Sequence, residues 1–102
     1  MSVNLTDTEG GVILCPSGDV VAESEPELRA KMRAVGSSGV TKMIVDLQNV
    51  RMMDSAGLGL LIAAHNSLQK TGGNLSVIHA SQDLLELFQS MRMHQHFSIS
   101  GD

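Results

Sequence analysis

The alternation of hydrophobic and polar positions is clearest in the middle of the chain. The run Lys42–Leu47 is short, apolar and rich in β-branched residues, which predicts a central strand of a sheet covered on both faces. After a short polar crossing, apolar residues recur at close to 3.6-residue spacing, which predicts a helix over residues 56 to 70. Its apolar face consists of Leu58, Leu61, Ile62, His65 and Leu68. The oxygen that caps this helix belongs to Asp54 or Ser55.

The junction between this strand and this helix is the first candidate for a functional site. Open parallel sheets carry their working residues beyond the carboxyl ends of the strands. The first turn of a helix offers unpaired N–H groups and a partial positive charge to an anion. We therefore expect a phosphate group on the Ser55 hydroxyl to be stabilised there.

The N-terminal part of the chain predicts a β-hairpin and a helix. Residues 2 to 7 and Val12–Cys15 have strand character, with turn-forming Gly10–Gly11 between them, and residues 16 to 18 end the second strand. Ser24–Glu27 has the pattern of a capping box with proline in the first turn. The helix that follows has one apolar face, made of Leu28, Met32 and Val35, and residues 36 to 39 close it.

The C-terminal part predicts one more helix between two strands. Thr71–Gly73 ends the preceding helix, and Leu75–His79 reads as the next strand. Ser81 caps a third helix, and Phe97–Ser100 alternates like an edge strand. The expected buried stripe of this helix is Leu84, Leu87, Phe88 and Met91.

These elements predict a single α/β domain over residues 1 to 102. Their order is β-β-α-β-α-β-α-β. Short right-handed crossovers between them give a mostly parallel central sheet of four to five strands with helices packed against it.

Composition narrows the possible functions. The chain has 102 residues, 42% hydrophobic content and a net charge of −4, which suits one core and gives no nucleic-acid footprint. It lacks an apolar run near the roughly 20 residues of a membrane span, and its start does not resemble a signal peptide. We therefore expect a cytoplasmic protein without membrane insertion. The single Cys15 reads as a buried thiol without an activating neighbour.

Several catalytic and ligand-binding patterns are absent or weak. Gly57 and Gly59 lack the third glycine of a dinucleotide fingerprint, and no Gly-Lys-Ser/Thr phosphate loop occurs. Ser55 does not stand in the Gly-x-Ser-x-Gly elbow of a serine hydrolase. His94 and His96 are a weak metal signal, because no acidic or thiolate set accompanies them. His65 reads as a half-buried histidine. The expectation is a protein without catalytic residues, metal or cofactor.

The segment Asp54–Gly59 reads Asp-Ser-Ala-Gly-Leu-Gly and resembles the signature of STAS domains of the anti-sigma factor antagonist type. The similarity covers most of residues 12 to 99 and includes Ile44–Leu47, Val50, Met53, Gly72, Gly73, Leu87 and Phe88. The family usually carries a Gly-acid-apolar-Asp element after its second strand. Here that element reads Gly18-Asp19-Val20-Val21, so valine replaces the last aspartate.

The resemblance implies a regulatory switch. In this family, a partner kinase phosphorylates the serine directly after the aspartate, which is Ser55 here. The unmodified chain is expected to bind an anti-sigma factor with serine kinase activity and so free a sigma factor, and phosphorylation ends the binding. A phosphatase acting on Ser55 is a further expected partner. The expected partner-binding residues are Asp19, Asp54, Ser55, Ala56, Gly57 and Leu58.

Two other functions remain open at this point. Some STAS domains are structural or regulatory subunits of membrane transport assemblies of the ABC type, in which Ser55 would be an interface residue without phosphorylation. A small nucleotide-binding protein is the second alternative, and the missing phosphate loop argues against it.

Overall fold

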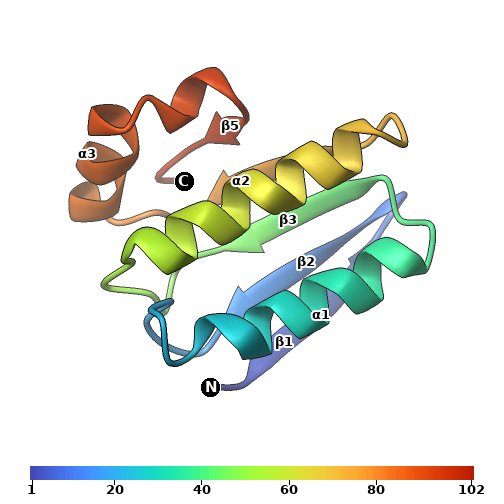
Figure 1. Ribbon diagram of the computed structural model, residues 1–102, viewed down its shortest axis with the longest axis horizontal. Helices are drawn as coiled ribbons and strands as arrows, with labels where there is room; N and C mark the ends of the chain where they lie inside the picture. Colours follow the sequence, from blue (N-terminus) through green and yellow to red (C-terminus); the bar gives the residue numbers. More distant parts are fainter.

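The computed structural model describes residues 1–102 and shows a five-stranded sheet with helices (Figure 1). The strands are β1 (Val3–Thr8), β2 (Gly11–Pro16), β3 (Lys42–Asp46), β4 (Asn74–Ile78) and β5 (Ser98–Ile99). The helices are α1 (Glu25–Ser37), α2 (Ser55–Gln69), α3 (Gln82–Ser90) and a 3-10 turn, η1 (Met93–Gln95). None of the helices has the length and apolar character that crossing a membrane requires.

The sheet has the order β1-β2-β3-β4-β5, and only the β1–β2 pair is antiparallel. The hairpin closes through Gly10 at φ +80°, a conformation that glycine adopts without strain. The predicted α/β class, the element order and the central position of β3 are therefore confirmed. The predicted last strand is present but reduced to Ser98–Ile99.

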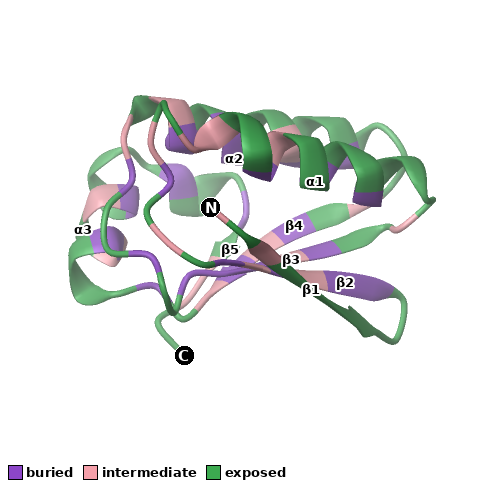
Figure 2. Cartoon of the chain, turned by 90° about the horizontal axis from the view of Figure 1, so that it is seen from below, coloured by how far each residue is buried: buried purple, intermediate pink, exposed green.

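The helices α1 and α2 lie side by side over one face of the sheet, and no helix covers the opposite face (Figure 2). Burial alternates along the strands accordingly. In β3, Met43 and Val45 are buried beneath the helices, whereas Ile44 between them is only partly covered. The prediction of a sheet covered on both faces is wrong, because a short β-branched run also suits a strand with one covered face and one half-exposed apolar face.

The core is aliphatic and rich in methionine. It contains 22 buried hydrophobic residues, among them four of the seven methionines. These are Met32, Met43, Met53 and Met93. The chain has no tryptophan or tyrosine and only two phenylalanines, Phe88 and Phe97. Flexible methionine side chains therefore fill the space that aromatic side chains occupy in other cores.

The predicted capping box at Ser24 is wrong. The Ser24 side chain makes no cap bond to α1. Its hydroxyl instead donates to the carbonyl of Asp19 at 2.7 Å and accepts from the N–H of Val21 at 3.1 Å. The serine therefore stabilises the loop before the helix, while the predicted cap of α3 at Ser81 is confirmed by a bond from the N–H of Leu84.

Four predicted burials need correction. Met91 is 57% exposed and Leu87 is only partly buried, because the chain turns out of α3 at Arg92, whose φ is +56°, and Met93 packs into the core instead. His65 is 5% exposed rather than half-buried. Cys15 is partly exposed rather than buried, because it lies on the face of the sheet without helices.

Candidate functional site

Two loops meet beyond the carboxyl ends of β2 and β3. Residues 17–24 join β2 to α1, and residues 47–54 join β3 to α2. The N–H of Val20 donates to the carbonyl of Met52 at 3.1 Å, and the N–H of Asp54 donates to the carbonyl of Val20 at 3.3 Å. The two loops thus form a short parallel β-bridge between Val20 and Met53, which fixes the loops around the start of α2.

Asp19 holds the same two loops together with its side chain. One carboxylate oxygen accepts hydrogen bonds from the N–H groups of Arg51 at 2.9 Å and Met52 at 3.1 Å. Asp19 itself is exposed, so its carboxylate both fixes the loops and carries negative charge at the surface.

Asp54 caps α2, which decides between the two caps that the sequence allows. Its Oδ1 accepts from the N–H groups of Ala56 at 2.9 Å and Gly57 at 3.2 Å. Its Oδ2 accepts from the N–H of Ala22 in the neighbouring loop at 2.9 Å. The hydrogen bond from Ala22 is the largest of the effects that lower the pKa of Asp54 below its ordinary value. Desolvation opposes it as the second-largest effect, and the hydrogen bonds from Gly57 and Ala56 lower the pKa further. The carboxylate therefore stays ionised at neutral pH.

Ser55 is the first residue of α2 and is exposed. Its hydroxyl makes no hydrogen bond to the rest of the chain, whereas the hydroxyls of Ser24 and Ser81 are both engaged. The expectation of free N–H groups for a phosphate at this helix end is met only in part, because Asp54 already occupies those of Ala56 and Gly57. A phosphate on Ser55 would instead stand beside an ionised carboxylate.

The two glycines of α2 have different surroundings. A Cβ atom at Gly57 would lie 2.5 Å from the Val20 carbonyl oxygen and 2.6 Å from Cγ of Met53, so this position has no room for a side chain. A Cβ atom at Gly59 would meet nothing within 4 Å. Gly57 thus allows α2 to approach the loop closely, and Gly59 leaves the helix surface bare one turn after Ser55.

Not all of the expected partner-binding residues are accessible at the surface. Gly57 and Leu58 are buried and support the helix start from beneath. Ser55, Ala56 and Gly59 reach the surface to different extents. One exposed residue was not expected, namely Met52, which is 60% exposed although its backbone is fixed by Asp19 and Val20. The sequence could have indicated this, because two methionines stand side by side in Arg51-Met-Met53. Only Met53 is buried in the bridge to Val20, which leaves Met52 at the surface.

Other polar groups lie apart from this site. Asp46 is buried and accepts from the N–H of Gln48 at 3.0 Å, and its Oδ1 lies 2.9 Å from Nδ1 of His79. His94 and His96 follow α3, and no group of three or more His, Cys, Asp or Glu side chains is placed to hold a metal ion. This arrangement gives no second centre that competes with the start of α2.

The candidate site is thus the start of α2, presented by two loops of a small α/β domain that are fixed to each other. The chain matches the family described as Mlab, STAS domain over residues 3–99, and it belongs to the STAS domain family.

Proteins with known names resemble this chain in sequence or in fold. The Anti-sigma-B factor antagonist of Bacillus subtilis is 28% identical over 101 residues, which is 99% of this chain and 92% of that protein. The crystal structure of an anti-sigma factor antagonist from Mycobacterium paratuberculosis superposes with a TM-score of 0.90 at 20% identity, covering 99% of this chain and 86% of the other. The structure of the Bacillus cell fate determinant SpoIIAA in the phosphorylated form superposes with a TM-score of 0.75 at 21% identity, covering 96% of this chain and 90% of the other.

Proposed function

We propose that this chain is an anti-sigma factor antagonist controlled by phosphorylation of Ser55. In its unmodified form it binds an anti-sigma factor with serine kinase activity, and this releases a sigma factor. Phosphorylation of Ser55 ends the binding, and a phosphatase restores it. The protein acts in the cytoplasm, as a regulatory binding protein without a reaction of its own.

The exposed, unbonded hydroxyl of Ser55 is the observation that carries this proposal. A kinase needs a hydroxyl that it can reach, and the bare surface at Gly59 lets the backbone of another protein come close. The loops around Ser55 are already fixed by Asp19 and Asp54, so a partner meets a preformed surface and has little ordering to do. The name of the Bacillus subtilis relative supports the same role.

Charge explains how the modification ends binding. A phosphate adds about −1.5 to −2 charges at neutral pH. On Ser55 these charges lie beside ionised Asp54, whose nearest N–H groups are already in use. An uncompensated charge in a desolvated interface costs several kcal/mol, so the affinity falls by roughly a thousandfold.

The switch is tested by measuring partner affinity for two variants. Ser55→Ala is expected to bind the anti-sigma factor constitutively, and Ser55→Asp is expected to lose binding. Asn66→Asp serves as a matched control, since it adds the same charge at an exposed position of α2 farther along the helix. Equal affinities of Ser55→Ala and Ser55→Asp would contradict the switch.

The modified residue is identified by incubation with the partner kinase and ATP, followed by mass mapping. Phosphate is expected on Ser55 and should disappear in Ser55→Ala. Recovery of a transporter ATPase with the unmodified chain, and no phosphorylation at Ser55, would favour a subunit of a transport assembly instead.

The docking surface is located with a pair of methionine variants. Met52 and Met91 are similarly exposed, at 60% and 57%, but only Met52 lies in a loop beside Ser55. Met52→Ala is expected to weaken partner binding about tenfold, because methionine is enriched at protein interfaces relative to the rest of the surface. Met91→Ala should bind like the unchanged protein. Equal losses in both variants would place the partner elsewhere.

A further inference from the structure

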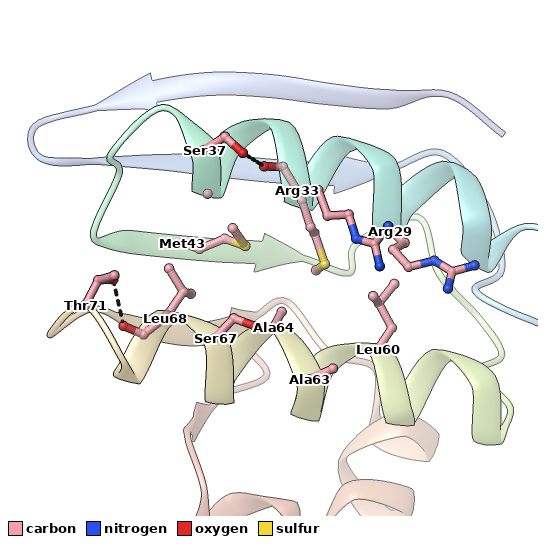
Figure 3. A pocket seen from close by; sticks show the side chains of 12 residues that line it. Arg29, Arg33, Ser37, Met43, Leu60, Ala63, Ala64, Ser67, Leu68 and Thr71 are labelled. Atoms are coloured by element: carbon pink, nitrogen blue, oxygen red, sulfur yellow. Dashed lines mark hydrogen bonds between the residues drawn. The ribbon is translucent and has the colours of Figure 1, made fainter.

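A groove of about 450 Å³ separates α1 from α2 on the helical face of the molecule (Figure 3). Its lining includes the buried side chains of Met32 of α1 and Met43 of β3. The wall formed by α2 carries the small residues Ala63, Ala64 and Ser67. Small side chains on one wall and flexible thioethers below leave an elongated space that runs along both helices. Its volume lies in the range of small-molecule sites.

Positive charge is concentrated at this groove although the protein is acidic. Arg29 and Arg33 are one helical turn apart on α1, and both line the groove. No aspartate or glutamate is among the lining residues, while the whole chain has a net charge of −4. Nε of Arg29 lies 3.0 Å from Glu25, and Arg33 forms no ion pair. The arginines therefore keep donors for an additional anion.

The opposite end of the groove has little capacity for polar recognition. The Ser37 hydroxyl donates to the Arg33 carbonyl at 2.9 Å, and the Thr71 hydroxyl donates to the Leu68 carbonyl at 3.0 Å. Figure 3 shows both of these residues at the end away from Arg29 and Leu60. A ligand thus meets charge at one end and mainly apolar surface along its remaining length.

We propose that this groove binds a single-chain amphipathic carboxylate, with the carboxylate on Arg29 and Arg33 and the hydrocarbon chain over Met32 and Met43. The planar guanidinium group matches a carboxylate with paired hydrogen bonds. From Leu60 to Leu68, α2 advances roughly 12 Å at ~1.5 Å per residue, which accommodates a chain of about ten carbons.

The lining disfavours two other classes of ligand. A nucleotide needs a stacking surface and several free donors and acceptors for its base, but neither phenylalanine lines the groove and the hydroxyls of Ser37 and Thr71 are engaged. A metal ion would be repelled by the arginines and would find no carboxylate or imidazole ligand among the lining residues.

Methionine methyl groups report directly on this site. The full chain is labelled with ¹³C at its methionine methyl groups and titrated with decanoate by NMR. Saturable shifts are expected at Met32 and Met43, while exposed Met52 and Met91 serve as internal references. The absence of saturable shifts, or larger shifts at Met52 and Met91, would overturn the proposal.

Variants test the roles of charge and space separately. The double change Arg29→Gln and Arg33→Gln is expected to weaken decanoate binding about tenfold or more, because it removes both charged donors. Lys31→Gln removes a charge from the same helix outside the groove and should leave binding unchanged. Ser67→Leu is expected to block the chain, and neutral decanol should bind more weakly than decanoate.

An unchanged affinity in the arginine variant, with its fold verified by circular dichroism, would overturn the assignment of the carboxylate site. Binding of decanol as tightly as decanoate would do the same. Neither result bears on Ser55, since none of the groove-lining residues belongs to the proposed switch.

Discussion

At the scale of single residues, Gly57 and Gly59 provide a matched pair on one helix. Gly57→Ala forces a methyl group against the Val20 carbonyl and Met53, which is expected to lower the free energy of unfolding by about 1–3 kcal/mol. Gly59→Ala meets open space and should raise it by up to about 1 kcal/mol, since alanine favours helix. Urea denaturation of both variants measures the difference. Equal effects would contradict the close packing at Gly57.

Asp54 links the site to the pH dependence of stability. Hydrogen bonds, first of all from Ala22, hold its pKa in the folded protein below the ordinary value of about 4. Its charge therefore stabilises the fold above the unfolded pKa, and this contribution is lost as the pH falls through the lower folded value. Asp54→Asn removes the titration.

The stability difference between the unchanged protein and Asp54→Asn is thus expected to be larger at pH 6 than at pH 2.5. Urea midpoints at the two pH values measure it. A difference that stays constant across this range would show that ionisation of Asp54 does not stabilise the fold.

The role of Asp54 also shows how far local sequence patterns reach. A capping residue before α2 follows from the pattern, but Asp54 and Ser55 are equally good candidates until the neighbouring loop is known. The bond from Ala22 to Asp54 joins residues 32 apart in sequence, so no local signal reveals it. The bonds from Ala56 and Gly57 to Asp54 explain why these two N–H groups are not free for a phosphate, contrary to what the sequence leads us to expect.

At the scale of elements, periodicity predicted each strand and each α-helix but not the 3-10 turn η1, and the wrong details have local causes. The Ser24 pattern looks like a capping box, but its hydroxyl satisfies the preceding loop at Asp19 and Val21. Met91 continues the apolar stripe of α3 in sequence, yet the helix ends before it and the left-handed Arg92 turns Met93 inward. A repeating pattern alone does not show where a helix stops.

The contact between α2 and the segment before β5 contains an unusual histidine. His65 is buried, its ring centroid lies 5.4 Å from that of Phe97, and its Nδ1 has no hydrogen-bond partner. An unpaired buried polar atom costs roughly 1–3 kcal/mol. His65→Phe keeps an aromatic ring there and removes the unpaired nitrogen.

We expect His65→Phe to raise the free energy of unfolding by about 1 kcal/mol in chemical denaturation. His65→Ala should lower it, because loss of the ring leaves a cavity beside Phe97. A lower stability of the phenylalanine variant would indicate that Nδ1 has a partner in solution.

At the scale of the whole molecule, the sequence predicted the fold class, but neither the face of the sheet that the helices cover nor the groove between α1 and α2. The order of elements and the right-handed crossovers predict a mostly parallel sheet, but not the order of the strands across it. That order decides the face, because successive crossovers in one direction place α1 and α2 on the same side. The groove between α1 and α2 was missed for a related reason. It arises where the small residues Ala63, Ala64 and Ser67 of α2 face Arg29 and Arg33 of α1, and neither segment shows this pairing by itself.

The arrangement of the site on a rigid sheet predicts that charge at Ser55 acts on binding and not on folding. Ser55 is exposed and unbonded, so Ser55→Asp removes no contact within the chain. The added charge is favoured by the start of the helix and opposed by Asp54, and these effects are of similar size and opposite sign. The free energy of unfolding should therefore change by less than about 0.5 kcal/mol.

Amide hydrogen exchange tests whether a charge at Ser55 leaves the fold unchanged. Central β3 and its neighbour β4 carry buried Val45 and Val77 and are expected to exchange slowest, whereas exposed β1 should exchange faster. The same order and the same protection of β3 and β4 are expected in Ser55→Asp. Loss of protection in these strands would mean that the charge acts by loosening the fold, and the partner would then respond to a changed structure instead of a charged surface.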